Sequence, residues 1–201
     1  MMTNQELLAN HNISGIFYSH GTYNFRKLLR IVNKENPNGV IDLLVIMMNP
    51  GSSKQESDTE ILDKEVNCRP DPTQYQIMRV MENTSRKHAV VLNLSDLRNA
   101  KSQAFYKRIP ELESSFEAHS IFSESRYSEI ESYLQISIPV IAAWGVSPKL
   151  DLLSQKAWNL LHNTPVIGWF KDENKRIPYH PYPRHQAKRK EWIIQICNHL
   201  S

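Results

Sequence analysis

Apolar residues gather along the chain into short runs that alternate with amphipathic stretches. Four runs are nearly continuous and apolar, as in strands that are buried on both faces. They cover residues 40–48, 89–94, 139–144 and 165–170. Helical spacing and cap residues predict helices over about 72–87, 101–109, 124–134, 148–163 and 186–200. Because strands alternate with helices, we expect a three-layer α/β/α sandwich with a mainly parallel four-stranded sheet.

The first 33 residues carry weaker patterns. Thr3 and Glu6 have the spacing of a capping box, and Leu28, Leu29 and Val32 fall on one face of a helix. We therefore expect a helix over 4–10, a short strand over 14–19 and a helix over 24–33. A chain of 201 residues has room for one domain. We predict a single α/β domain over residues 1–201, in which residues 1–22 form an N-terminal helical extension.

Composition narrows the class of protein. The longest apolar run, Leu43 to Met48, has six residues, whereas a membrane span needs about 18. The first twelve residues lack the apolar core of a signal peptide, so we expect a cytoplasmic protein with no membrane partner. Two cysteines, Cys68 and Cys197, cannot build a disulfide framework or a four-cysteine metal site. We expect neither a metal nor a cofactor.

The distribution of charge says more than the net charge of +3. Residues 171–190 hold seven lysines and arginines against two acidic residues. Such a stretch is either a solvated surface or a rim that contacts phosphates. In the second interpretation, the nucleic-acid contacts are Arg184, Lys188, Arg189 and Lys190.

Polar and turn-forming residues follow the predicted parallel strands, and ligands of such sheets bind beyond the carboxyl ends of the strands. The first strand is followed by Asn49, Pro50, Gly51 and Ser52, and then by a polar connection to residue 68 that is long enough to suggest a functional loop. The later strand ends carry Asn93, Asp96, Trp144, Gly145, His180 and Tyr182. We expect these residues to converge on one edge of the sheet as a site for substrate.

Three of these side chains suit particular chemistry. The carboxamide of Asn49 can hold a water or a sugar hydroxyl, although Asn49-Pro50-Gly51 is also an ordinary turn. Asn93 can pair with the edge of a nucleobase, or it satisfies a local turn. His180 precedes a proline, and a rigid neutral imidazole can donate to developing negative charge, unless it is a structural surface residue.

Other motifs have equally plain structural interpretations. Asp96 and Arg98 have the character of a surface ion pair, and Trp144 at a strand end commonly packs in a core. The sequence contains no glycine-rich phosphate loop, no dinucleotide-binding fingerprint and no nucleophile elbow.

The motif order resembles two families. The segments MMNPGSS, DPT, VVLNLSDLRNA, AAWG and YHPYPR resemble an uncharacterised bacterial family, domain of unknown function 1643, from about Tyr23 to Ile196. Here Gly51 departs from the family's first turn, and Ser95-Asp96 stands where the family has an apolar residue and alanine. The same order is similar to the uracil-DNA glycosylase superfamily, in which such motifs follow the strands of a four-stranded parallel sheet. That resemblance implies that Asn49 positions the attacking water, Asn93 reads the base and His180 stabilises the departing base anion.

Three functions fit these observations. The first is hydrolysis of the N-glycosidic bond to a nucleobase in DNA or a nucleotide. The second is a non-catalytic module of the same fold that binds nucleic acid or a nucleotide. The third is an enzyme of another class in the same crevice, because a fold does not by itself establish an activity.

Overall fold

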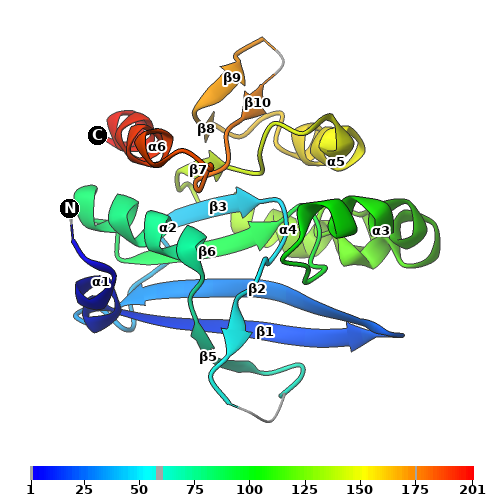
Figure 1. Ribbon diagram of the computed structural model, residues 1–201, viewed down its shortest axis with the longest axis horizontal. Helices are drawn as coiled ribbons and strands as arrows, with labels where there is room; N and C mark the ends of the chain where they lie inside the picture. Colours follow the sequence, from blue (N-terminus) through cyan, green and yellow to red (C-terminus); the bar gives the residue numbers. More distant parts are fainter. Residues whose placement is uncertain (1, 58–60, 175) are drawn as a thin grey trace.

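A computed structural model describes residues 2–57, 61–174 and 176–201 (Figure 1). Within these residues the centre of the molecule is a mixed sheet of eight strands in the order β4-β5-β1-β2-β6-β3-β7-β8. Its strands are β1 His11–His20, β2 Tyr23–Asn33, β3 Leu43–Met47, β4 Lys54–Gln55, β5 Glu65–Arg69, β6 His88–Asn93, β7 Val140–Ala142 and β8 Val166–Ile167. A separate antiparallel pair is formed by β9 Phe170–Asp172 and β10 Ile177–Pro178.

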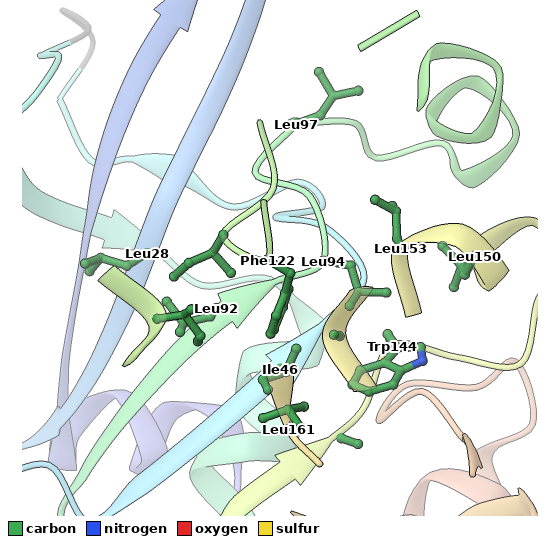
Figure 2. Packing of buried hydrophobic residues seen from close by; sticks show 14 of the residues in the cluster. Leu28, Ile46, Leu92, Leu94, Leu97, Phe122, Trp144, Leu150, Leu153 and Leu161 are labelled. Carbon is green, nitrogen blue, oxygen red and sulfur yellow. The ribbon is translucent and has the colours of Figure 1, made fainter. Parts of the chain in front are cut away.

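Helices cover both faces of the sheet (Figure 1). The helices are α1 Asn4–Asn10, α2 Pro72–Asn83, α3 Ser102–Ser115, α4 Tyr127–Leu134, α5 Asp151–Leu160 and α6 Gln186–Leu200. Apolar side chains of α1, α2 and α6 pack on one face, and those of α3, α4 and α5 pack on the other. Figure 2 shows part of the cluster on the side of α3, α4 and α5, which includes Leu92 and Ile46 from adjacent strands together with Leu153 and Trp144. Each face of the central strands therefore has its own apolar core.

The four predicted strands form the parallel half of the sheet. β6, β3, β7 and β8 lie side by side in parallel register, for example with Val45 opposite both Val91 and Ile141. The expectation of a sheet with only four strands is wrong, because β1, β2, β5 and β4 extend it by antiparallel pairing from β6 outward. The connection predicted over 49–68 contains β4 and most of β5, apart from residues 58–60, which lie outside the described residues.

The N-terminal region differs most from the prediction. The helix over 4–10 is present, with the capping box of Thr3 and Glu6. Residues 11–20 form a strand that contains the short strand predicted over 14–19, so the description of residues 1–22 as a helical extension is wrong. Residues 24–33 belong to its hairpin partner rather than to a helix. The two strands enclose a turn at Gly21, whose φ of +57° suits glycine. Long-range pairing with β6 and burial on both faces outweigh the local helical spacing.

The hairpin contains a β-bulge that decides where two cationic side chains point. Ile16 pairs with Leu28, but the next pair is Phe17 with Arg26, so Lys27 is an extra residue in β2. Leu28 and Phe25 pack with the cluster beside α4, and Lys27 reaches Glu129 on that side at 3.2 Å. Arg26 is thereby turned to the opposite face, the side of α2, where its partner Phe17 also packs.

Residues at the helix ends explain where the helices begin and stop. Asp71 caps α2 through hydrogen bonds from the backbone N–H groups of Thr73 and Gln74, and Pro72 follows as the first helical residue. α6 spans the residues predicted for it, whereas α2 ends at Asn83, four residues before the predicted end. α3 continues through Pro110 into a segment predicted as irregular.

Candidate functional site

A cavity of about 700 Å³ opens at the carboxyl edge of the parallel strands. Nine residues proposed from the sequence line it: Asn49, Pro50, Gly51, Ser52, Trp144, Gly145, His180, Tyr182 and Arg184. They come from the ends of β3 and β7 and from the loop between β10 and α6. The wall is completed by the first turn of α2, by Tyr106 from α3 and by Arg26 from β2. The volume is in the range of pockets for small molecules and cofactors, roughly 300–1,000 Å³.

The carboxamide of Asn49 is held in place through its Nδ2 atom. Its Nδ2 donates to the backbone carbonyls of Leu97 at 3.2 Å and Asn99 at 2.7 Å, which uses both N–H donors. Because both partners are acceptors, the orientation of the amide is determined. Oδ1 accepts no hydrogen bond from any residue the structure describes, and the side chain is on the cavity wall. Asn49 thus presents a fixed acceptor to a water or a substrate hydroxyl.

Gly51 brings the first turn close to a carboxylate. Its φ is +67°, and a Cβ at this position would lie 2.9 Å from Asp71 Oδ2. Asp71 Oδ1 is held by the α2 backbone, so Oδ2 is the oxygen nearer the turn. The absence of a side chain at Gly51 therefore allows the Asp71 carboxylate to lie against the wall that also carries Asn49.

His180 is held as a neutral imidazole of defined tautomer. Burial lowers its pKa to about 4, and the nearby Asp71 opposes that shift only in part. The backbone N–H of Tyr182 donates to His180 Nδ1 at 3.1 Å, so the ring proton resides on Nε2. A Cβ at Gly145, where φ is +101°, would lie 3.6 Å from His180 Cβ, so the two strand-end motifs are in contact. His180 can act as a neutral N–H donor at this wall.

The His180 loop is braced from α2 and α6. Arg189 donates from Nε to the Pro183 carbonyl at 2.7 Å, from Nη1 to the Tyr182 hydroxyl at 2.7 Å and from Nη2 to the Arg184 carbonyl at 3.0 Å. Its guanidinium also stacks 3.7 Å from the centroid of the Tyr182 ring. Gln76, buried in α2, donates to the Pro181 carbonyl at 3.2 Å. These contacts make Arg189 a positioning residue of the loop rather than a free cation for phosphate.

The other basic residues of the predicted rim are spread apart. Arg184 lines the cavity and is exposed. Lys188 pairs with Glu191 at 2.9 Å and lies over the Trp169 ring. Lys190 lines a second, smaller hollow of about 410 Å³ between α2 and α6. Lys175, from the same basic stretch, lies outside the described residues. The structure therefore brings only Arg184 of the four to the main cavity.

Asn93 and Asp96 do not line the cavity, so direct contact with substrate is not supported for either. Asn93 is 0% exposed at the end of β6, and neither its Nδ2 nor its Oδ1 has a partner among the described residues. Asp96 is also 0% exposed and accepts from Arg126 Nη1 at 2.5 Å and from the Tyr18 hydroxyl at 3.1 Å. Burial raises the pKa of Asp96. The predicted surface ion pair is a buried one with a different arginine.

Trp144 belongs mainly to the core, as its structural interpretation suggested. The indole is 2% exposed and its ring centroid lies 4.8 Å from that of Trp158. Tyr106 is the more open aromatic on the wall, and its hydroxyl donates to the Met48 sulfur at 3.6 Å. Tyr106 is therefore the better candidate to face a planar ligand.

Arg26 and Asp71 are not among the site residues expected from the sequence. Arg26 falls within the helix predicted over 24–33, and Asp71 directly precedes the helix predicted over 72–87. Arg26 is 2% exposed, yet it lines the cavity. The Gly21 turn between two apolar stretches was the available signal for the hairpin that carries Arg26.

Two absences hold for the described part of the chain. None of its helices has both the length and the apolar character required to cross a membrane. Across residues 2–57, 61–174 and 176–201, no group of three or more His, Cys, Asp or Glu side chains is arranged to hold a metal ion.

Comparison with known proteins identifies the family. A solved structure of a mutant feruloyl esterase module from Clostridium thermocellum, complexed with sinapinate, is similar at 13% sequence identity and a TM-score of 0.35. The similarity covers 98% of this chain and 66% of that chain. No curated protein matches. The family described as "protein of unknown function (DUF1643)" matches residues 26–182, a span that includes Arg26, Asn49 and His180. The chain belongs to the DUF1643 family.

Proposed function

We propose that the cavity hydrolyses the N-glycosidic bond between a sugar and a nucleobase, in DNA or in a nucleotide. The observation that carries the proposal is the pairing of a fixed acceptor with a fixed neutral donor across one cavity. Asn49 presents Oδ1, and His180 presents Nε2–H. In this reaction the bond from C1′ to the base nitrogen breaks, water supplies the hydroxyl that C1′ gains, and the water proton ends on the base.

Each residue has a role that its surroundings favour. Asn49 Oδ1 would hold the water by accepting one of its hydrogens. His180 would donate from Nε2 to the negative charge that develops on the leaving base, as preorganised donors do in other enzymes. Its low pKa means that it does so as a neutral imidazole, without protonating the base. Asp71 Oδ2, beside Gly51, would first accept the proton that the water loses. The base anion would then take up this proton through solvent, which restores the Asp71 carboxylate.

The motif order provides independent support. In the uracil-DNA glycosylase superfamily, to which the chain shows a resemblance, the corresponding motifs lie at the ends of parallel strands. We include that fold relationship in the proposal. Asp71 is a better candidate carboxylate than Asp96, because Asp96 is buried in its ion pair with Arg126.

The test is release of free base, measured by chromatography. Substrates would be oligonucleotides with uracil, hypoxanthine or alkylated bases, together with free nucleosides and nucleotides. Asn49→Ala and His180→Ala should each lower the rate about 10²–10³-fold, the usual effect of losing one preorganised group. Matched controls are Asn163→Ala and His199→Ala, which alter exposed residues outside the cavity.

Two outcomes would contradict the proposal. If wild-type protein releases no base from any substrate but binds oligonucleotides or nucleotides in the cavity, the chain is a binding module of the same fold. If base is released and Asn49→Ala retains full activity, the assignment of the water site to Asn49 is wrong.

A further inference from the structure

Arg26 is a buried cation whose hydrogen-bonding capacity is unused. Its side chain is 2% exposed, and its Nε and Nη1 have no hydrogen-bond partner among the described residues. No carboxylate of those residues lies within 4.0 Å of its guanidinium. Burying a charge without a partner is costly, so a structure that keeps one usually provides it with a ligand. Arg26 lines the same cavity as Asn49 and His180.

The surrounding structure is shaped to hold this guanidinium in place. The bulge at Lys27 turns Arg26 to the cavity side of the sheet. Gly15 on the paired strand lies against the side chain, since a Cβ there would be in van der Waals contact with Arg26 Cδ at 3.4 Å. Bulges next to binding sites commonly redirect one side chain in this way.

The guanidinium stays charged in this setting. Burial lowers the pKa of Arg26 to about 10, while Asp71 and the other nearby acidic groups oppose the shift. Asp71 neutralises Arg26 only incompletely, because its oxygens lie more than 4.0 Å from the guanidinium nitrogens. With Arg184 also on the wall, the cavity lining has two arginines and one aspartate. The described lining therefore carries a net charge of +1.

From this geometry we infer that Arg26 binds the terminal phosphate of a free nucleotide whose base occupies the same cavity. The inference rests on the proposed function for the base end of the ligand, but not for the phosphate end. A phosphate carries about −1.5 to −2 charge at neutral pH, which matches an unpaired guanidinium. A cation that is 2% exposed is reached by a group at the end of a ligand more readily than by a diester, whose chain must leave on both sides.

The rim favours the same substrate class. A polymer would need several free cations along its backbone. Of the four basic residues predicted for that role, Arg189 uses its donors within the protein and Lys188 is paired with Glu191. Among the described residues of the cavity wall, Arg26 is a cation that lies below the surface with Nε and Nη1 unpaired.

The experiment compares ligands that differ only in phosphate. Calorimetry would measure the affinity of wild-type protein for inorganic phosphate, for nucleoside 5′-monophosphates and for the matching nucleosides. The monophosphate should bind about ten- to a hundredfold more tightly than its nucleoside. Arg26→Met should remove that difference while leaving nucleoside affinity unchanged. The matched control is Arg30→Met, which removes an arginine from the same strand outside the cavity.

Several results would overturn the inference. Equal affinity of monophosphate and nucleoside for the wild type would do so, and this arm does not depend on whether Arg26→Met folds. An equal loss of nucleoside and monophosphate binding in Arg26→Met would assign Arg26 to the base instead. Tighter binding and faster base release for an oligonucleotide than for the monophosphate would move the substrate class to DNA.

The two proposals fail separately. If phosphate-dependent binding is present without base release, the inference stands and the glycosidic reaction is wrong. If base is released equally from nucleosides and monophosphates that bind equally, the reaction stands and the phosphate site is wrong.

Discussion

The neutral state of His180 makes a prediction about stability that needs no substrate. In the unfolded chain the imidazole has an ordinary pKa near 6.5, and in the folded protein burial lowers it to about 4. Between these pH values the unfolded state binds a proton that the folded state does not. Lowering the pH through this range therefore favours unfolding, and the stability that His180 contributes above pH 6.5 is lost as the pH falls to about 4.

The magnitude follows from the shift. Each unit of pKa corresponds to about 1.4 kcal/mol, so the difference between the unfolded and folded pKa of His180 corresponds to roughly 3 kcal/mol of stability. His180→Asn removes the titrating group but keeps a polar side chain of similar reach. The free energy of unfolding of wild type minus that of His180→Asn should therefore become more negative by about 2–3 kcal/mol between pH 7 and pH 4.

The assay is urea unfolding of both proteins at half-unit pH steps. Other titrating groups cancel in the difference, except those that interact with His180. Asp71 is the charged group that raises the pKa of His180, so the wild type and His180→Asn should also be compared in an Asp71→Asn background. A difference that stays flat from pH 7 to pH 4 would refute the assignment of a buried neutral imidazole. A difference that becomes more positive as the pH falls from 7 to 4 would refute its sign.

Three further substitutions test the supports of the cavity. Gly51→Ala should lower the free energy of unfolding by about 1–2 kcal/mol in urea, because φ is +67° and the new Cβ meets Asp71 Oδ2. Arg189→Met should cost about 2–3 kcal/mol by the same assay and raise the KM of any activity, because the loop loses its brace. Arg126→Met should cost about 3–5 kcal/mol at pH 8 and less at pH 5, where the Asp96 carboxyl can take up a proton.

The parallel half of the fold could be predicted because its signals are local. Nearly continuous apolar runs fixed the strands that became β3 and β6, and Asp71-Pro72 marked the start of α2 by hydrogen bonds within one turn. The antiparallel half could not be read in the same way. The Leu28, Leu29 and Val32 spacing fits a helix, and only pairing with residues far along the chain makes it a strand.

The candidate site shows the same contrast between local signals and long-range pairing. Asn49 and His180 were identified because strand ends of a parallel sheet meet at one edge. Asn93 lies outside the cavity lining, because the end of a strand does not specify which face a side chain takes, and here the side chain is fully covered. The position of Arg26 on the cavity wall depends on a β-bulge. A bulge is a one-residue irregularity that carries no sequence signature of its own.

The bulge also decides how the molecule responds mechanically to a ligand. Arg26 belongs to the β1–β2 hairpin, whereas Asn49 follows β3 of the parallel half and His180 follows β10 of the separate antiparallel pair. A ligand held by all three would cross-link two units that otherwise share the β2–β6 ladder and their packed cores. Amide hydrogens of the hairpin that lie far from the ligand should then exchange more slowly with solvent. Local opening of the hairpin would require the ligand to dissociate from Arg26 first.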